Sequence, residues 1–424
     1  MTLAGIPVDF ILFALTLLGV ALFHHHTLAV ALTGLTAITL YKLGFGDFSG
    51  VSGLAGLAGL LRHEWVTLAN LLGLLLGFAL LADHFERSGL PTLLPRFLPD
   101  DWKGGLVLLF AVFVLSSFLD NIAAAMIGGT MAAVLYNKRV HIGFLAAIVA
   151  ASNAGGSGSV VGDTTTTMMW IAGVPALQVV DAYVAALVAT LIVGYFAARQ
   201  QHALQPIMRD NPQGAHFEAP RLAIVVIILL AAIGANLFFN LRDPEVLNHF
   251  PVIGLAVWLA ILLTAPWRRP TWSLLPGAFR GTVFLLSLVT CAAMMPVQAL
   301  PPASWQAAFG LGFVSAVFDN IPLTALALRQ GGYDWGFLAY AVGFGGSMIW
   351  FGSSAGVALS NMYPQAKSVA AWVRGGWHVT VGYVAGFFVL LAILGWHPDA
   401  WQRHGAPAAA APHATTSAIP SSKP

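Results

Sequence analysis

Two stretches of this sequence resemble each other, and each places an acid and an amide inside an apolar segment. The first reads Ser-Ser-Phe-Leu-Asp-Asn-Ile over residues 116–122, and the second reads Ser-Ala-Val-Phe-Asp-Asn-Ile-Pro over residues 315–322. Their acids, Asp120 and Asp319, lie 199 positions apart (319 minus 120) in a chain of 424 residues. An unpaired carboxylate is costly in hydrocarbon, so an acid at this depth is a candidate functional residue. Paired acids in two halves are typical of a binding centre between repeats.

Composition sets the class of protein. The chain is 58% hydrophobic and 8% charged, whereas a soluble domain has about 25% charged residues. The sequence therefore predicts an all-α polytopic membrane protein with the lipid bilayer as its partner. A net charge of +2 without a basic cluster argues against nucleic-acid binding. The single cysteine, Cys291, excludes an intrachain disulfide and a cysteine-based metal site.

The apolar segments predict simple membrane spans, because about 20 apolar residues cross the hydrocarbon core. In the first half they are residues 6–23, 27–43, 66–81 and 176–197, and in the second half 222–240, 252–265, 282–297 and 377–394. Residues 44–65 are Gly-rich in part and are not placed by this rule.

Two further segments carry the Asp-Asn pairs and have the wrong length for simple spans. Residues 104–135 are too long for one helix and too short for two, with polar Lys103 and Lys138 at the ends. A re-entrant helical hairpin with its tip at bilayer depth fits this pattern, and residues 303–329 repeat it. Irregular backbone at that depth must be buried in protein or line a wet cavity.

Two more segments are predicted to be broken spans. Residues 140–172 are interrupted by a Gly- and Ser-rich stretch at 153–163, and residues 337–360 by similar stretches at 343–347 and 352–356. Glycine-rich sequence disfavours a continuous helix. Unwound segments of this kind coordinate ions in transporters.

These elements predict two inverted repeats, each with three spans, a re-entrant hairpin, a broken span and one further span. The first repeat covers residues 1–198, a polar cytoplasmic linker 199–221, the second repeat 222–396, and a disordered tail 397–424. Five crossings per half is an odd number, so the halves must have opposite orientations. Most Lys and Arg residues then fall on one side, which the positive-inside rule makes cytoplasmic, with both termini periplasmic.

The candidate site follows from depth and irregular backbone. Asp120, Asp163 and Asp319 combine the two, and hard cations prefer oxygen ligands such as those of their polar neighbours. The predicted cation- and proton-binding residues are Asp120, Asn121, Asn153, Ser157, Asp163, Thr164, Thr165, Asp319, Asn320, Ser347, Ser353 and Ser354, with the three aspartates as Na⁺ ligands.

Other interpretations of these side chains stay open. Each aspartate could cap a half-helix through the orphan N–H groups at its start. A Thr run can also form hydrogen bonds inside a membrane helix without binding any ligand. No P-loop pattern is present in the sequence, so ATP is not expected to drive the protein. No cofactor is expected besides Na⁺ and H⁺ as transported ions.

At these residues the chain resembles the NhaD-type sodium/proton antiporters. The similarity is carried by Asn-Ala-Gly-Gly at 153–156, by Gly-Asp-Thr-Thr-Thr-Thr-Met-Met-Trp-Ile at 162–171, by the second broken span with Tyr333–Tyr340 before it, and by the Asp-Asn pair in both hairpins. The wider ion transporter superfamily includes citrate/dicarboxylate and arsenite carriers, whose hairpin tips resemble Ser-Asn-Thr. The Asp-Asn pairs depart from that pattern toward the cation branch. The resemblance implies an elevator-like transport domain and a homodimer.

The sequence therefore predicts a secondary transporter, not an enzyme, that exchanges a monovalent cation, Na⁺ first, for H⁺ across the bacterial cytoplasmic (inner) membrane. A desolvated carboxylate titrates closer to neutrality, so proton and cation can compete for it. The main alternative is an anion carrier for citrate, a related carboxylate or arsenite, held at half-helix N-termini. A channel is disfavoured because hairpins that meet at mid-membrane close the path, and an intramembrane hydrolase lacks a nucleophile–base pair.

Overall fold

The computed structural model describes residues 2–3, 5–23, 26–48, 50–90, 98–208 and 217–398. The predicted disordered tail falls outside these residues apart from its first two positions. The middle of the predicted linker also falls outside them, and the described part of that linker includes the end of a helix, up to Leu204.

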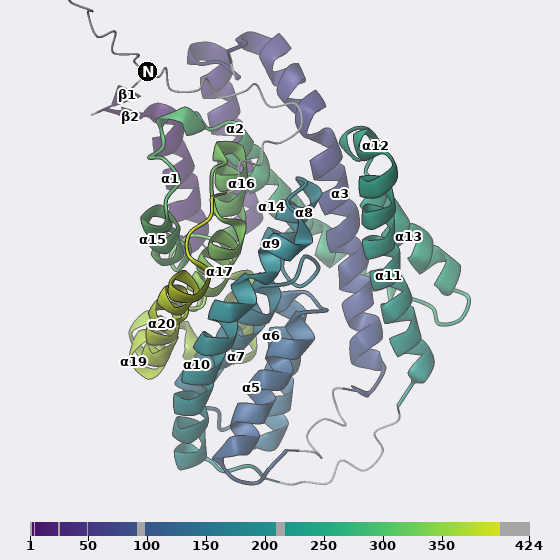
Figure 1. Ribbon diagram of the computed structural model, residues 1–424, viewed down its shortest axis with the longest axis vertical. Coiled ribbons are helices and arrows are strands. Elements are labelled where there is room, and N and C mark those ends of the chain that lie inside the picture. Colours follow the sequence, from purple (N-terminus) through teal and green to yellow (C-terminus); the bar gives the residue numbers. More distant parts are fainter. Residues whose placement is uncertain are drawn as a thin grey trace, which may run out of the picture.

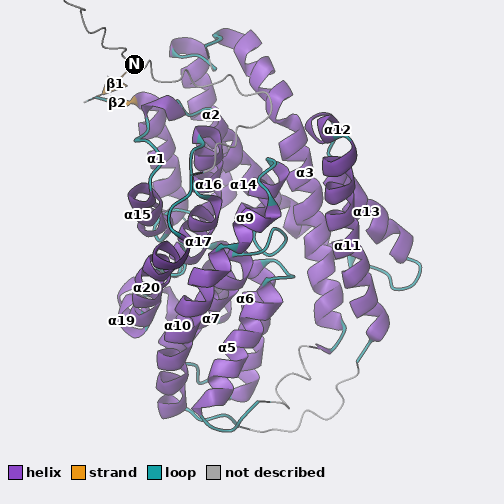
Figure 2. Ribbon diagram, in the orientation of Figure 1, coloured by secondary structure: helices purple, strands orange, loops and turns teal. Residues whose placement is uncertain are grey.

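Helices make up nearly all of the described secondary structure, and the only strands in it are two short ones near the N-terminus (Figure 2). In chain order the elements are β1 (Thr2–Leu3), β2 (Ile6–Pro7), α1 (Val8–Leu22), α2 (Thr27–Phe45), α3 (Gly53–Arg87), α5 (Trp102–Ser116), α6 (Asn121–Leu135), α7 (Ile142–Ser157), α8 (Thr164–Ile171), α9 (Ala176–Val180), α10 (Ala182–Leu204), α11 (Ala219–Arg242), α12 (Pro244–His249), α13 (Val252–Thr264), η2 (Trp272–Leu274), α14 (Leu275–Ala293), η3 (Val297–Ala299), α15 (Trp305–Ser315), α16 (Asn320–Gln330), α17 (Trp335–Gly345), α18 (Ser354–Met362), η4 (Pro364–Lys367), α19 (Val369–Gly375) and α20 (Trp377–Leu394).

The helices confirm a multi-pass membrane protein. Among the described residues, six helices are long and apolar enough to cross a bilayer, and several shorter apolar helices accompany them. Of the unplaced residues 44–65, the first two end α2, and 53–65 form the first part of α3, a single helix of 35 residues that starts at Gly53 and contains the predicted span 66–81.

Both segments predicted as hairpins consist of two short helices joined at an Asp-Asn pair. Hairpin 1 is α5 and α6, which break at residues 117–120, and hairpin 2 is α15 and α16, which break at residues 316–319. A helix of 15 residues such as α5 or α6 is about 22 Å long, less than the roughly 30 Å hydrocarbon core. Each half of a hairpin is therefore shorter than the hydrocarbon core of a membrane is thick.

Both predicted broken spans are interrupted, but the interruptions are shorter than predicted. Helix α7 continues to Ser157, so the break covers 158–163 and not 153–163; the second break covers 346–353. The prediction took every glycine as a helix breaker. Gly155 instead lies inside α7, where a side chain would collide with the carbonyl oxygen of Phe113 on α5. Such a glycine permits close helix contact and leaves the helix intact.

The helices form two packing groups, which meet in the centre of Figure 1. The scaffold helices are α1, α2, α3, α11, α13 and α14, and the site helices are α5 to α10 and α15 to α20. The same helix contacts occur in both halves. Within a half, α1 packs against α2 as α11 packs against α13, and α5 packs against α7 as α15 packs against α17. Between the halves, α3 packs against α13 as α14 packs against α2, and α6 packs against α18 as α16 packs against α8. Helices α3 and α14, α7 and α17, and α10 and α20 pack against their own counterparts.

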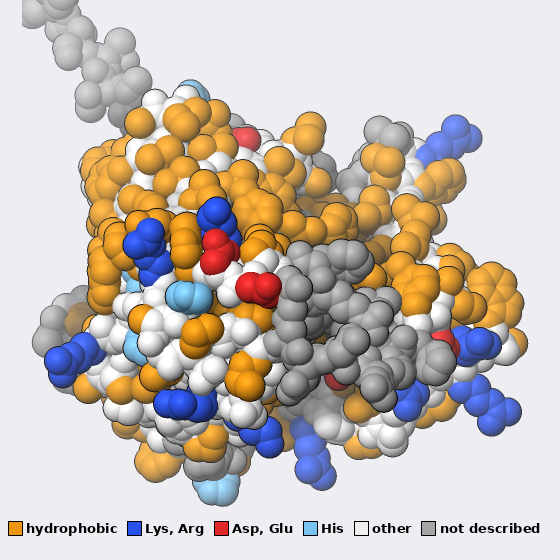
Figure 3. All heavy atoms as spheres, turned by 90° about the horizontal axis from the view of Figure 1, so that it is seen from below, with side chains coloured by type: hydrophobic (Ala, Val, Ile, Leu, Met, Phe, Trp, Pro, Cys, Tyr) orange, Lys and Arg blue, Asp and Glu red, His pale blue; other side chains and the backbone are white. Residues whose placement is uncertain are grey.

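One end of the molecule is rich in cations. Seen from below, Lys and Arg side chains are spread over this face beside apolar flanks (Figure 3). Glu218, at the start of α11, binds Arg221 at 3.1 Å and Arg268 at 3.2 Å there. The hydrogen bond from Arg268, with that from Arg221, holds the pKa of Glu218 below its usual value. These contacts tie the start of α11 to the loop after α13.

Candidate functional site

Four half-helices start at the residues that the sequence singled out. Asp120 precedes α6, Asp319 precedes α16, Asp163 precedes α8 and Ser353 precedes α18. Each side chain accepts a hydrogen bond from a backbone N–H of the helix it precedes, at 3.0 to 3.3 Å. All four residues are therefore N-caps, as the alternative interpretation of the aspartates expected.

The capping residues match in pairs between the two halves. Asp120 and Asp319 have the same φ of −53° with ψ of 140° and 139°, and Asp163 and Ser353 have φ of −143° and −140°. Ser353 lies 190 positions after Asp163 (353 minus 163). The two halves thus share one backbone geometry at these positions, but only the first half places an acid at the start of the second helix of its broken span.

Asn153 of α7 connects the two halves through buried hydrogen bonds. Its Oδ1 accepts from Nδ2 of Asn121 at 3.0 Å. Its own Nδ2 donates to the hydroxyls of Ser347 at 2.9 Å and Ser353 at 3.1 Å. Four predicted site residues from hairpin 1, α7 and the second break therefore form one network.

Asp163, Asp319 and hairpin 2 complete the cluster of candidate site residues. Asn320 donates to Asp163 Oδ2 at 3.4 Å, and Ser354 donates to Asp319 Oδ2 at 3.2 Å. Asp163 lies within electrostatic range of both Asp120 and Asp319. It is 3% exposed, whereas Asp120 and Asp319 are partly exposed. The three carboxylates thus surround one region without forming a compact cage.

The candidate site offers oxygen atoms as ligands, and its three acids have no cationic partners among the described residues. Among the described residues, none of the three aspartates forms an ion pair with Lys, Arg or His. Within the same residues, no group of three or more His, Cys, Asp and Glu side chains gathers closely enough to hold a metal ion. A cation bound here would therefore take one or two carboxylates together with amide and hydroxyl oxygens, a donor set suited to a hard monovalent ion.

The hydroxyls of three predicted site residues do not join this network. The Ser157 hydroxyl donates to the Ala154 carbonyl of its own helix at 2.8 Å. The Thr164 hydroxyl makes no hydrogen bond to the aspartates among the described residues, although Thr164 is buried. Thr165 adjoins the Asp163 carboxylate and gives its backbone N–H to Oδ1. The hydroxyls of the next two threonines return to the Asp163 carbonyl, which stabilises the start of α8.

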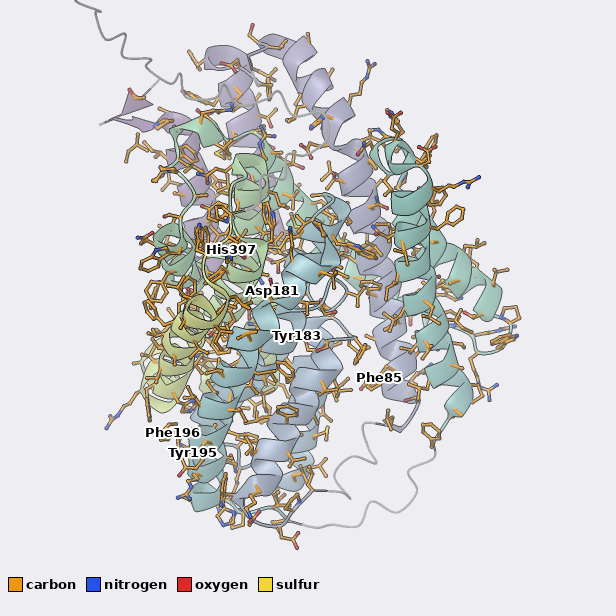
Figure 4. All side chains as sticks on the ribbon, in the orientation of Figure 1. Phe85, Asp181, Tyr183, Tyr195, Phe196 and His397 are labelled. Atoms are coloured by element: carbon orange, nitrogen blue, oxygen red, sulfur yellow. The ribbon has the colours of Figure 1, made fainter. Side chains whose placement is uncertain are left out.

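Two residues beside the network were not among the predicted site residues. Gly343 of α17 lies so close to Asp163 that an added Cβ would be 3.5 Å from its Oδ2. Its signal in the sequence is its place 190 positions after Asn153 (343 minus 153). Tyr183, on the first turn of α10 (Figure 4), donates to the Gly155 carbonyl at 3.2 Å. No sequence pattern points to this tyrosine.

The net charge of this region follows from the four helix starts and the three acids. Each helix N-terminus carries roughly +0.5 elementary charge, so four contribute about +2. Three ionised aspartates contribute −3, which leaves about −1 in the region. Without the acids, four N-termini would favour an anion; with them, the balance favours one monovalent cation or one proton.

Comparison with known proteins gives relatives of one kind. No family model matches the chain. It is 27% identical over 373 residues to sodium/proton antiporter 1 of Arabidopsis thaliana, a match that spans 76% of this chain and 59% of the relative. Antiporter 2 of the same plant is 28% identical over 67% of this chain and 75% of that protein. The Na(+)/H(+) antiporter NhaD of Vibrio cholerae is 25% identical over 66% of this chain and 68% of its own length. The predicted resemblance is therefore confirmed: this multi-pass membrane protein is a relative of proteins named sodium/proton antiporters, NhaD among them.

Proposed function

We propose that this protein is a secondary transporter that exchanges Na⁺ for H⁺. The observation that carries the proposal is the cluster of Asp120, Asp163 and Asp319 at half-helix N-termini, with no cationic partner among the described residues. The net charge of about −1 derived above fits one monovalent cation or one proton. The names of the relatives support the same exchange.

The recurring helix contacts support two inverted repeats, with domain bounds as the sequence predicts them. Hairpin 1 lies in the lower half of Figure 1 and α16 in the upper half, as inverted hairpins would. We assign the cation-rich lower end to the cytoplasm, with the linker 199–221 there and both termini periplasmic. The membrane is assigned as the bacterial inner membrane and the assembly as a homodimer, both from the resemblance.

In the proposed mechanism, proton and Na⁺ compete for the same carboxylates. Asp163 is the principal group because it is the most buried of the three aspartates and interacts electrostatically with both Asp120 and Asp319. Asn320 orients its Oδ2, and the Thr165 N–H fixes its Oδ1. On the other side, hydrogen bonds with Asn153 fix the positions of Asn121, Ser347 and Ser353. Ser354 orients Oδ2 of Asp319, and we assign the remaining predicted ligands, Ser157 and Thr164, to the rim of this site.

The direct test is Na⁺-dependent proton movement in proteoliposomes that contain the purified protein and no organic anion. An imposed Na⁺ gradient is expected to move protons in the opposite direction, at a rate that saturates with Na⁺. The anion carrier is the second candidate, because four helix N-termini point at one region. Absence of exchange until citrate or arsenite is added would refute the antiporter and support that carrier.

A further inference from the structure

The packing between the two helix groups is not equivalent in the two halves. Helix α14 packs against α16 of hairpin 2, and α3 packs against α8. The counterparts of these contacts would be α3 with α6 and α14 with α18. Within the part of the chain that the structure describes, neither pair is packed comparably. The scaffold therefore holds hairpin 2 closely and hairpin 1 only loosely.

The α14–α16 contact is a continuous apolar interface. Leu288, Cys291 and Ala292 of α14 belong to one buried cluster with Ile321 and Ala325 of α16. Met168 of α8 and Leu71 of α3 join the same cluster. Through Ile321, this cluster reaches the residue next to Asn320 of the candidate site.

An ion pair lies at the base of hairpin 2. Arg329, in the last turn of α16, has Nη1 at 3.7 Å from Oε1 of Glu64 on α3. The Glu64 side chain is 5% exposed and that of Arg329 is 19% exposed. Hairpin 1 has no equivalent cation, because the position 199 residues before Arg329 (329 minus 199) is Thr130. The exposed Thr130 hydroxyl donates to a carbonyl of its own helix.

We propose that Glu64 and Arg329 form a latch that holds hairpin 2 on the scaffold and closes the candidate site toward the end where this hairpin is rooted. This inference rests on the proposed exchange, which requires that the site reach each side in turn. The α14–α16 interface must therefore separate once per cycle, and the latch sets how often it does.

Cys291 provides a native probe of this interface. It is the single cysteine of the chain, it is fully buried, and it lies in the cluster shared with α16. Alkylation of a buried thiol requires that reagent reach it. The rate of its modification by N-ethylmaleimide, followed by intact mass in proteoliposomes, therefore reports the exposure of this cluster, to which hairpin 2 contributes Ile321 and Ala325, with detergent-denatured protein as the fully accessible reference.

Glu64→Gln and Arg329→Gln are each expected to raise this rate about tenfold, as coupling between contacting charges typically allows. The double variant should raise the rate by less than the product of the two single effects, because the contact between the two residues is lost only once. Arg62→Gln is the matched control: it removes an exposed cation two residues from Glu64 on the same helix and should leave the rate unchanged. Monodisperse elution, and rates below that of denatured protein, exclude unfolding.

Exchange of the two charges, Glu64→Arg with Arg329→Glu, should return the rate toward that of the wild type. Unchanged rates in both single variants, additive effects in the double variant, or an equal effect of Arg62→Gln would overturn the latch. The readout does not depend on transport. If wild-type protein fails the exchange test while labelling still follows the ion pair, the proposed function is wrong and the latch remains.

Discussion

Replacement of Asp163 by asparagine separates a capping role from a binding role. The variant Asp163→Asn keeps a side-chain oxygen for the Thr165 N–H, which Asp163 now binds at 3.1 Å. Asparagine caps helices about as well as aspartate does. Reorientation of the Asn320 amide, which donates to Asp163 Oδ2, avoids two facing donors. The fold should therefore persist while one negative charge is lost.

The size of the effect follows from Coulomb's law. A unit charge about 4 Å from a cation contributes about 4 kcal/mol at an effective dielectric constant of about 20. Since each 1.4 kcal/mol is roughly a factor of ten, the affinity for Na⁺ should fall by about 1,000-fold. The charge balance of the region changes from about −1 to about zero, as each N-terminus adds roughly +0.5. Exchange at millimolar Na⁺ should then be undetectable.

The assay is Na⁺-dependent proton movement in proteoliposomes, with reconstituted protein quantified for each variant. Asp181→Asn is the control, because Asp181 is an exposed acid at the start of α10 and makes no capping hydrogen bond with its side chain. Addition of Ser353→Asp to the Asp163→Asn variant restores a charge at the matching N-cap and should recover part of the exchange. Wild-type rates in Asp163→Asn would refute the reasoning and reduce Asp163 to a cap.

Two further predictions concern the same cluster. If one proton and one Na⁺ compete for one site, each unit fall in pH below its apparent pKa should weaken apparent Na⁺ affinity about tenfold, with a plateau above it; a flat profile in proteoliposomes without organic anions would contradict shared carboxylates. Asn153→Ala removes three buried hydrogen bonds, those to Asn121, Ser347 and Ser353. At about 0.6 kcal/mol for each bond inside a membrane protein, the variant should be less stable by about 2 kcal/mol. Unfolding in a denaturing detergent measures this loss, and unchanged stability would show that the network does not stabilise the fold.

The hairpins show how far the sequence could predict this fold. An acid and an amide in the middle of an apolar run leave few possible local structures, since irregular backbone at membrane depth must be buried in protein or line a wet cavity. Nearly all of α5 and α6 lies within the segment 104–135, and nearly all of α15 and α16 lies within the segment 303–329. The start of α3 was beyond reach, because its Gly-rich first turns resemble a loop and are helical only in the context of tertiary packing.

The candidate site could be predicted in its acids but not in its hydrogen bonds. Charge and depth identify an aspartate wherever it lies in the sequence. The partners of Asn153 depend on how two halves meet, and no local pattern distinguishes Ser347, which joins the network, from Ser157, which bonds to its own helix. Gly343 was missed for a similar reason, because its contribution is the absence of a side chain beside Asp163.

The unequal pair of capping residues, Asp163 in one half and Ser353 in the other, has a consequence for leakage. With three acids and four N-termini of roughly +0.5 each, the empty region carries about one negative charge, and occupation by one Na⁺ or one proton neutralises it. Transfer of an uncompensated charge into hydrocarbon costs several kcal/mol, and a membrane voltage of about 100 mV acts on it with about 2.3 kcal/mol more. Under the proposed exchange, the empty protein is therefore the form least able to move its site across the membrane. A second acid at position 353 would leave a singly loaded site charged as well, so under the same proposal Ser353 is what makes one bound ion sufficient for movement.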